Sequence, residues 1–223
     1  VVAPMLYMVR PGVGERLEEF VNNGGTLVTT YWSGIVDEND LCFLGGFPGP
    51  LKKVTGIWAE ELDALYDEDV NYVSIEEGNS LGMKGEYEAR IFCDLIHSEG
   101  AEVLATYKTD FYKGMPALTC NNFGEGQAYY IAFRNNDEFL SDFYSSLAKK
   151  LTLKRAIEID LPKGINAQVR MDEKNEFVFF MNFSSEEKTI DIKDLDLTDM
   201  VTGEKVTKEM EIEPYGVRIV RRK

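Results

Sequence analysis

The residue types that carry out most enzyme chemistry are sparse in this sequence and poorly spaced for it. Ser33 follows an apolar segment, where an α/β hydrolase would place its nucleophile, but W-S-G around it lacks the G-x-S-x-G turn. A serine nucleophile also needs a histidine as its base, and the sole histidine, His97, ends the apolar run I-F-C-D-L-I-H. We therefore predict no catalytic triad, and an amidotransferase-like enzyme that uses Ser33 or Cys42 is a minor alternative.

Paired carboxylates are the second kind of chemistry to consider, because glycoside hydrolysis needs two carboxyl groups placed on either side of a sugar bond. The acidic clusters are Glu60-Glu61 with Asp63, Glu76-Glu77 and Glu186-Glu187. The first lies on the polar side of a predicted amphipathic helix, the second precedes a glycine-rich loop, and the third lies in a predicted turn. Solvated surface carboxylates explain each cluster, so we predict no catalytic residue in this chain.

The sequence also predicts neither a metal site nor a cofactor site. Cys42, Cys93 and Cys120 are far apart, without a C-x-x-C pair or a nearby histidine, so they indicate neither a zinc site nor a disulfide framework. Such cysteines fit a reducing compartment, and we predict a cytoplasmic protein. Gly12 resembles the start of a phosphate-binding loop, but Leu17 stands where the third glycine of that loop is needed.

Charge and hydropathy narrow the choice of partners. The 223 residues include 24 basic and 39 acidic ones, a formal charge of −15, which repels nucleic acid and anionic membrane surfaces. No apolar run in the sequence approaches the roughly 20 residues that span a bilayer. We predict that neither nucleic acid nor a membrane is a partner.

The first thirty residues predict a strand, a helix and a second strand. Residues 1–9 are typical of a strand buried on both faces, residues 14–22 carry apolar side chains at helical spacing, and residues 26–31 are β-branched and apolar. Such a β-α-β unit predicts a sheet that is at least partly parallel. Ligands of these sheets bind beyond the carboxyl ends of the strands, which makes Tyr31 and Trp32 weak candidates for contact with a sugar.

The remainder predicts more strands, one helix and a change of architecture near residue 155. Short strands are predicted at residues 70–76, 103–107, 116–120 and 127–133, and a helix from about residue 136 to 151. Beyond residue 155 apolar residues alternate with a period of two between short turns. We predict two domains, residues 1–154 with an α/β fold and residues 155–223 with a small antiparallel β-sandwich.

Residues 38–66 are the most informative segment. A short apolar run ends in G-G-F-P-G-P, which excludes both helix and strand. Apolar residues then recur at spacings of three and four, which predicts a short amphipathic helix across residues 51–65. An apolar loop of this kind needs a cover. The candidate contact surface for another subunit consists of Phe43, Leu44, Phe47, Leu51 and Trp58, and a loop folded over its own core is an equal alternative.

Four stretches carry a family resemblance. The longest is the ungapped pattern D-x-N-D-L-x-x-x-G-G-F-P-G-P-L-x-x-x-x-G-I-x-x-E-E-x-D-A-L at residues 37–65. The others are V-V-A-P-M-L-Y-M-V at residues 1–9, G-G-T-L-V-T-T-Y-W-S-G-I-V-D-E-N-D at residues 24–40 and P-A-L-T-C-N-N-F-G-E-G-Q-A-Y-Y-I-A at residues 116–132. Together they resemble the trimerisation domain of the β-galactosidases of glycoside hydrolase family 42. E-F-V-F-F-M-N-F at residues 176–183 resembles the C-terminal β domain of that family.

The resemblance implies a fold and a function. It implies a three-layer domain similar to flavodoxins and glutamine amidotransferases, truncated at its front, followed by the C-terminal β domain. The family's catalytic (β/α)8 barrel is then expected before Val1, where both catalytic glutamates hydrolyse terminal β-galactosides with retention. This chain would be the non-catalytic part that assembles a homotrimer. The alternative is a free-standing carbohydrate-binding or regulatory module derived from such an enzyme.

Overall fold

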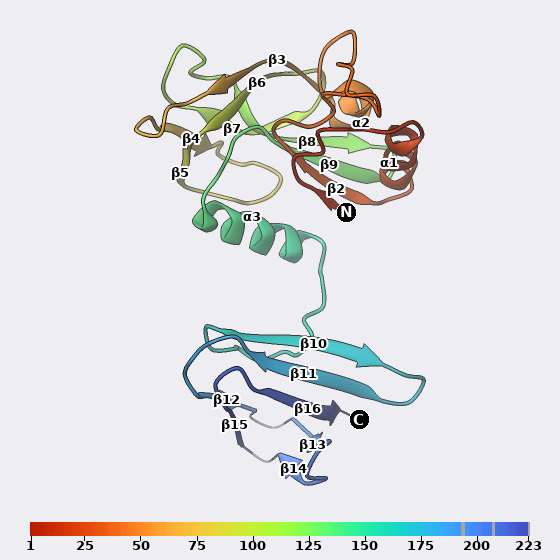
Figure 1. Cartoon of the computed structure of the whole chain (residues 1–223), viewed down its shortest axis with the longest axis vertical. Helices are drawn as coiled ribbons and strands as arrows, with labels where there is room; N and C mark the ends of the chain where they lie inside the picture. The colour runs from red at the N-terminus through yellow and green to blue at the C-terminus, as the bar shows by residue number, and fades with distance from the viewer. Residues whose placement is uncertain (193–194, 207, 223) are drawn as a thin grey trace. The chain divides into compact units, whose positions relative to one another are not determined.

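The chain folds into two compact units, Val1–Thr152 and Leu153–Lys223. The computed structural model describes residues 1–192, 195–206 and 208–222, and Figure 1 traces the elements in chain order. Each unit has a core of its own. Among the described residues, three clusters of buried side chains lie within residues 1–152, and a fourth lies beyond residue 156.

The first unit, described in full, is built on a mixed seven-stranded sheet in the order β1-β2-β9-β8-β7-β4-β5. Its strands are β1 (Val2–Ala3), β2 (Thr26–Thr30), β4 (Asn71–Ile75), β5 (Glu86–Ala89), β7 (Glu102–Tyr107), β8 (Pro116–Phe123) and β9 (Gly126–Ile131). β1, β2 and β9 run parallel to one another. The remaining neighbours are antiparallel. The predicted partly parallel sheet is thereby confirmed.

The prediction of a long buried strand at the start was wrong. β1 has only two residues and pairs only with β2, so it lies at the edge of the sheet. Pro4 follows it and has no N–H to donate to a ladder, and Met5 has a φ of 45°. Val1 and Val2 are exposed, which contradicts a strand buried on both faces.

Helices cover both faces of the parallel part of the sheet. Successive strand residues point to opposite faces: Leu27 and Ala128 contact α1 (Val13–Asn22), η1 (Gly49–Leu51) and α2 (Lys52–Thr55), whereas Val28 and Tyr129 lie in the core beneath α3 (Asp137–Lys150). The first unit is therefore a sheet-rich α/β unit with a helix layer on each side.

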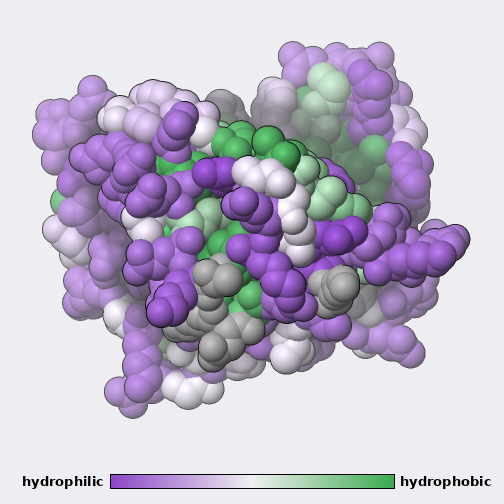
Figure 2. Space-filling view, turned by 90° about the horizontal axis from the view of Figure 1, so that it is seen from below, coloured by the Kyte–Doolittle hydropathy of each residue, from purple (hydrophilic) through white to green (hydrophobic). Residues whose placement is uncertain are grey.

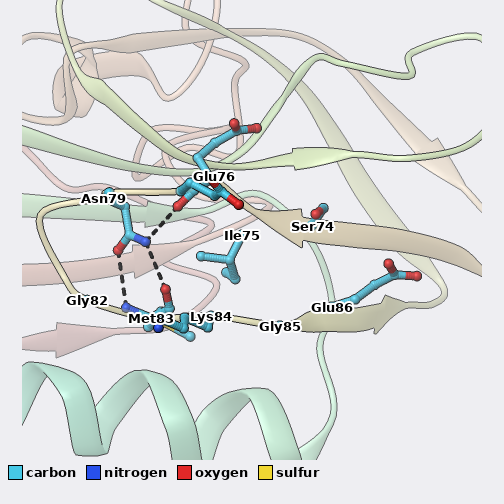
Figure 3. Close-up of a pocket in the computed structure, with 11 residues that line it drawn as sticks. Ser74, Ile75, Glu76, Asn79, Gly82, Met83, Lys84, Gly85 and Glu86 are labelled. Atoms are coloured by element: carbon cyan, nitrogen blue, oxygen red, sulfur yellow. Dashed lines mark hydrogen bonds between the residues drawn. The ribbon is translucent and has the colours of Figure 1, made fainter.

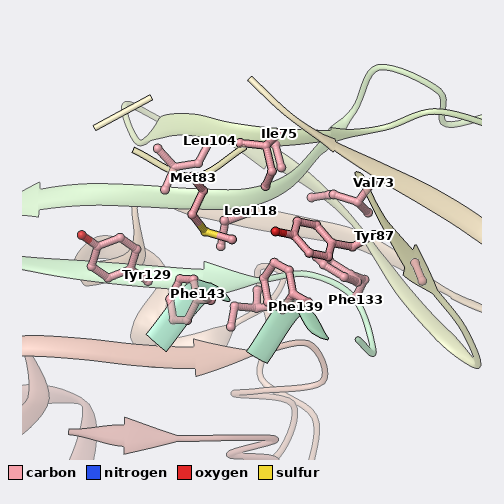
Figure 4. Packing of buried hydrophobic residues seen from close by; sticks show 14 of the residues in the cluster. Val73, Ile75, Met83, Tyr87, Leu104, Leu118, Tyr129, Phe133, Phe139 and Phe143 are labelled. Atoms are coloured by element: carbon pink, nitrogen blue, oxygen red, sulfur yellow. The ribbon is translucent and has the colours of Figure 1, made fainter. Parts of the chain in front are cut away.

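The helix α3 closes the largest core and confirms the helix predicted at this position. Asn136 caps it, because its Oδ1 accepts a hydrogen bond of 2.9 Å from the backbone N–H of Phe139. Phe139 and Phe143 are fully buried, and the ring of Phe139 lies 5.2 Å from that of Tyr87 and 4.9 Å from that of Phe133. Figure 4 shows these rings gathered between α3 and the sheet. Edge-to-face packing of this kind anchors the helix.

The helix predicted across residues 51–65 was wrong beyond Thr55. Gly56, with a φ of 64°, ends α2, and β3 (Ile57–Ala64) then pairs with β6 (Phe92–Ser98) in a two-stranded antiparallel ribbon. A β-bulge between Ala59 and Glu61 shifts the register. Ala59 opposes Ile96 and Leu62 opposes Asp94, so residues three apart share one face of the strand. The apolar residues that predicted the helix do not share a face, because Trp58 opposes His97 and Leu62 opposes Asp94. Pairing with β6, and not the local spacing of apolar residues, therefore makes this segment a strand.

The described part of the second unit consists of short antiparallel strands. A five-stranded sheet has the order β10-β11-β16-β13-β14, and β12 pairs with β15. Their bounds are β10 (Ile165–Met171), β11 (Glu176–Asn182), β12 (Lys188–Asp191), β13 (Leu197–Asp199), β14 (Lys205–Val206), β15 (Glu209–Ile212) and β16 (Val217–Arg222). Both sheets contribute to one core, which includes Phe180, Val220, Ile190 and Ile212. Two sheets that share a core form the predicted small antiparallel sandwich.

The face of the chain drawn in Figure 2 is mostly hydrophilic. Figure 2 shows one face of the chain, largely covered by hydrophilic side chains with hydrophobic ones gathered towards the centre, in keeping with the formal charge of −15. None of the helices in the described residues has the length and apolar character required to cross a bilayer.

Candidate functional site

Residues 35–47, which we call the apolar loop, carry the candidate subunit surface. Hydrogen bonds pin both of its ends: the N–H of Phe43 donates to the carbonyl of Ile35 over 3.0 Å, and that of Ala59 donates to the carbonyl of Phe47 over 2.8 Å. The loop is therefore fixed at its base to the first unit.

The turn within the apolar loop is also ordered by its own side chains. The Oδ1 atom of Asp37 accepts hydrogen bonds from the N–H groups of Asn39 and Leu41, over 2.8 and 3.1 Å. Lys52 donates from Nζ to the carbonyl of Gly45 over 2.9 Å. An Asx turn and a lysine brace of this kind hold a tight loop without a core of its own.

The tip of the apolar loop places large apolar side chains in water. Leu44 is 99% exposed and Leu41 is 63% exposed. Phe43 and Phe47 are half-buried. The position of Leu44 is unfavourable for an isolated chain, since burying a leucine side chain is worth about 1.5–3 kcal/mol. An ordered loop with an exposed leucine at its tip fits a contact surface for another molecule.

The other two predicted surface residues are placed differently. Leu51 is 0% exposed and lies in the core with Val21 and Val54, so its side chain supports the loop from within and is not at the surface. Trp58, on β3, is half-buried, and its ring stacks on that of His97 with centroids 4.6 Å apart. His97 Nε2 in turn lies 2.8 Å from Glu60 Oε2.

A second cluster, which we call the aromatic surface, consists of Tyr7, Trp32 and Phe92. The ring of Trp32 lies 5.7 Å from that of Tyr7 and 5.1 Å from that of Phe92. Tyr7 is exposed, and the other two are half-buried. Tyr31 is only 7% exposed and contacts Phe92 from beneath, with centroids 5.9 Å apart. Of the two predicted sugar contacts, only Trp32 therefore presents a ring at the surface.

The aromatic surface lies where ligands of parallel sheets bind. Trp32 follows the carboxyl end of β2, and Tyr7 follows β1, which is the edge at which such ligands usually collect. Three residues other than glycine adopt left-handed backbone conformations in these segments: Met5 with a φ of 45°, Trp32 with 56° and Ile91 with 66°. Strained residues of this kind persist only where the surroundings hold them.

A buried carboxylate, Asp94, lies beneath the aromatic surface. Its Oδ2 atom accepts hydrogen bonds from the backbone N–H of Trp32 over 3.0 Å and from the hydroxyl of Tyr130 over 2.6 Å. Asp94 is 4% exposed and Tyr130 is 1% exposed. Burial raises the pKa of Asp94 to about 6, although the hydrogen bonds from Tyr130 and Trp32 oppose the rise.

Ser33 is a structural residue in this fold. It is fully buried, its Oγ donates to the carbonyl of Thr30 over 2.7 Å, and the same oxygen accepts from the N–H of Leu6 and the hydroxyl of Thr29. A nucleophile needs a free lone pair, an adjacent base and access for substrate. Ser33 joins the segment after β1 to the end of β2, and its buried, fully engaged hydroxyl is unsuited to act as a nucleophile.

The cysteines are also poor candidates for chemistry. Cys93 and Cys120 are buried, and burial raises the pKa of both thiols, that of Cys93 to about 11. The thiolate form that reacts is therefore scarce near neutral pH. Cys42 is exposed on the apolar loop. Among the residues that the structure describes, no group of three or more His, Cys, Asp and Glu side chains is placed to hold a metal ion.

The predicted acidic clusters are engaged with neighbouring side chains. Asp63 accepts a hydrogen bond from the hydroxyl of Tyr112 over 2.8 Å. Glu186 binds Lys188, and this contact lowers the pKa of Glu186. Glu76 accepts a hydrogen bond from Thr106 over 2.7 Å. These contacts support the interpretation as surface carboxylates.

The glycine-rich connection between β4 and β5 borders an open pocket of about 740 Å³. Figure 3 shows that the amide of Asn79 organises this loop: its nitrogen donates to the carbonyls of Glu76 and Met83 over 2.8 and 2.9 Å. Its oxygen accepts from the N–H groups of Leu81 and Met83, both over 3.2 Å. The side chain of Asn79 therefore uses its hydrogen-bonding groups to hold the loop itself.

Sequence patterns missed several of these residues. Asp94 lies inside an apolar run, where an acidic residue is itself a signal, because a buried carboxylate needs partners. Tyr130 and Trp32, which supply those partners, are 36 and 62 residues away in sequence. Leu41 belongs to the same apolar run as Leu44 and differs from Leu51 only in its tertiary setting.

Two family models match the chain. One, described as the β-galactosidase trimerisation domain, matches residues 1–154. The other, described as the β-galactosidase C-terminal domain, matches residues 164–222. Together the two matches cover both compact units.

Similar proteins and structures agree with these matches. The β-galactosidase Pbg of Clostridium perfringens is 99% identical over 223 residues, which are 100% of this chain and 32% of that protein. The β-galactosidase BglY of Alicyclobacillus acidocaldarius is 49% identical, over 100% of this chain and 32% of that protein. The crystal structure of the β-galactosidase from Rahnella sp. R3 aligns with a TM-score of 0.90 at 50% identity, over 100% of this chain and 32% of that chain. The chain thus spans about a third of the length of the proteins it matches.

Proposed function

Because the chain belongs to the glycoside hydrolase family 42 β-galactosidases, as the non-catalytic portion with the trimerisation and C-terminal domains, we propose that it assembles three subunits into a homotrimer. The observation that carries the proposal is the exposure of Leu44 at the tip of an ordered loop, within the segment that matches the trimerisation domain. Buried apolar side chains at the centre of an interface supply most of its stability.

The proposed interface is the apolar loop and its immediate neighbours. Leu44 and Leu41 would be its centre, and the half-buried Phe43, Phe47 and Trp58 would extend it. Leu51, which is in the core, is left out of the surface. The proposal requires that Leu44 lose its contact with water on assembly, and this requirement makes it testable.

The first test is the native mass of the chain, measured by light scattering over a concentration series. We expect a trimer that dissociates on dilution, because an interface on this chain obeys mass action. A monomer at every concentration would contradict the proposal that these residues suffice for assembly.

The second test places a charge at the tip of the loop. Leu44→Asp should weaken association at least tenfold, since an aspartate in an apolar interface loses hydration without gaining a partner. Leu153→Asp is the matched control, because Leu153 is also exposed, at 62%, but lies outside the loop. A Leu44→Asp chain that assembles as well as the control would exclude Leu44 from the interface.

Further parts of the proposal concern the whole protein. We propose that the complete enzyme hydrolyses terminal β-galactosides with retention, and that no residue of this chain takes part in the reaction. We propose domain bounds at residues 1–154 and 155–223, the first domain being a truncated relative of the flavodoxin and glutamine-amidotransferase folds. The unpaired cysteines support a cytoplasmic location.

A second candidate function is sugar binding at the aromatic surface, and the half-buried ring of Trp32 at the strand ends supports it. Indole rings stack on the apolar faces of sugars. Titration with galactose and lactose, followed by amide chemical shifts, should show saturable changes around Trp32 that Trp32→Ala abolishes and Trp58→Ala leaves intact. Changes that survive Trp32→Ala would place the sugar elsewhere.

A further inference from the structure

The backbone at Trp32 is held by the buried carboxylate of Asp94, which lies neither at the surface proposed for sugar nor at the one proposed for another subunit. Trp32 has a φ of 56°, in the left-handed region that side chains other than glycine rarely adopt. Its N–H donates a hydrogen bond of 3.0 Å to Oδ2 of Asp94, a residue of the strand β6. This hydrogen bond joins residues 62 positions apart and fixes the peptide from which the indole projects.

The indole itself has few restraints other than its backbone and two rings. Tyr7 and Phe92 contact it at 5.7 and 5.1 Å, and Tyr7 is exposed and tied to the chain by a long hydrogen bond of 3.3 Å to Asp40. A strained residue relaxes when its restraint is removed. The position of the ring therefore depends on the hydrogen bond to Asp94.

We propose that Asp94 is a positioning residue for Trp32, and that protonation of this one carboxylate loosens the aromatic surface. The ionised carboxylate accepts two hydrogen bonds on Oδ2, from Trp32 and Tyr130. The protonated form is a weaker acceptor, because hydrogen bonds to a charged group are about twice as strong as those to a neutral one. Protonation thus weakens the restraint on the Trp32 peptide.

The surroundings of Asp94 allow this change near neutral pH. Burial raises its pKa to about 6. The titratable groups around it are Tyr130 on β9, Tyr107 on β7, Tyr31 after β2 and Cys93 beside it on β6, and Asp94 raises the pKa of each of them further. Arg134, after β9, interacts with the Tyr31 hydroxyl. The neighbouring phenols and the thiol are neutral at pH 6, so their ionisation does not compete with that of Asp94 in this range.

Only the effect on sugar binding rests on the proposed sugar contact. The role of Asp94 in positioning Trp32 can be measured without sugar. A loosened aromatic surface would bind a saccharide less well below pH 6 than above it. If the Trp32 amide resonance responds to pH as expected and no sugar binds, the proposed sugar contact fails while the role of Asp94 stands.

The experiment follows the Trp32 amide resonance in the unaltered chain between pH 4.5 and 8. The amide proton should move with a midpoint near pH 6, because its hydrogen-bond acceptor loses its charge. In Asp94→Asn this titration should disappear, since the amide oxygen replaces Oδ2 and does not ionise. Persistence of the same titration in Asp94→Asn would overturn the proposal.

A second variant tests the direction in which the midpoint pH moves. Tyr130→Phe removes a hydrogen bond that stabilises the ionised carboxylate, so the midpoint should move to higher pH. Tyr129→Phe is the matched control, because Tyr129 is an equally buried tyrosine on the same strand whose hydroxyl donates to Gln127. A midpoint that stays in place in Tyr130→Phe, or moves equally in the control, would contradict the proposal.

Indole fluorescence gives an independent readout of the ring. It requires a Trp58→Phe background, because the chain has two tryptophans and the emission of Trp58 would overlap that of Trp32. In that background the emission of Trp32 should change with the same midpoint as the amide, and Asp94→Asn should remove the change. Emission that is constant from pH 4.5 to 8 would show that the ring does not respond to Asp94.

Discussion

The apolar loop and the region beneath the aromatic surface each place a side chain in an unfavourable environment, and they do so in opposite ways. The loop exposes the side chain of Leu44 to water at 99%, and none of the residues that the structure describes covers it. The aromatic surface buries a carboxylate, but supplies it with two hydrogen-bond donors. The described residues leave Leu44 uncovered, whereas the two hydrogen bonds offset part of the cost of burying the Asp94 carboxylate, whose pKa is still raised by burial.

The contrast teaches where to look for partners. An exposed apolar side chain on an ordered loop is explained by a contact outside the chain. A buried charge with its donors in place needs nothing external and is explained by what it holds, here the strained backbone of Trp32. Substitutions in the two regions should therefore affect different measurements: association for the loop, and folding stability and its pH dependence for Asp94.

The largest expected effect separates two leucines of the predicted contact surface. Leu51→Ala should lower the free energy of unfolding by about 2–5 kcal/mol, since Leu51 is fully buried in the core with Val21 and Val54. Leu44→Ala should change the unfolding of the dissociated subunit by less than about 0.5 kcal/mol while weakening its association. Urea unfolding and light scattering on both variants check this pair. Equal unfolding effects would remove the distinction.

The pH dependence of stability is the next largest effect. The pKa of Asp94 rises from an ordinary 3.8 to about 6 in the folded chain, so between these pH values the folded state holds a proton that the unfolded state has released. The associated stability is present below pH 4 and is lost as the pH rises through 6. The loss should amount to roughly 3 kcal/mol.

Urea unfolding of the native chain and of Asp94→Asn from pH 4 to 7.5 isolates this contribution, because the other carboxylates titrate in both proteins. The difference between the two free energies of unfolding should change across the window. Parallel pH profiles would mean that Asp94 ionises normally in the folded chain.

A smaller effect is expected when the hydroxyl partner of Asp94 is removed. Tyr130→Phe should cost about 1.5–3 kcal/mol at pH 8, where the acceptor is charged, whereas Tyr129→Phe should cost about 0.5–1.5 kcal/mol, because its acceptor Gln127 is neutral. Chemical unfolding at pH 8 and pH 4.5 checks both. The Tyr130→Phe cost should shrink at the lower pH, and a cost independent of pH would argue against a charged acceptor.

The smallest effect is expected at the edge of the candidate interface. His97 and Glu60 form an exposed pair, with side chains 41% and 54% exposed, and exposed pairs contribute little because water screens them. Glu60→Gln should change the free energy of unfolding by less than about 0.5 kcal/mol, as measured by urea unfolding. A loss above 1 kcal/mol would indicate that the stack of His97 on Trp58 depends on the contact between His97 and Glu60.

The sequence by itself determined the elements whose residues lie close together along the chain. Helical spacing predicted α3, alternation predicted the strands of the second unit, and the segment at residues 37–65 identified the family. These signals are local, because a helix turn and a strand pleat each repeat within a few residues.

Only the tertiary structure decided burial and partners. Apolar residues at helical spacing predicted a helix across residues 57–64, but pairing with β6 made the segment a strand. Leu44 and Leu51 belong to the same apolar segment, yet one lies in water and the other in the core. Asp94 meets Trp32 and Tyr130 only because β6 crosses the ends of β2 and β9. Contacts between residues far apart in sequence set these outcomes, and no local period encodes them.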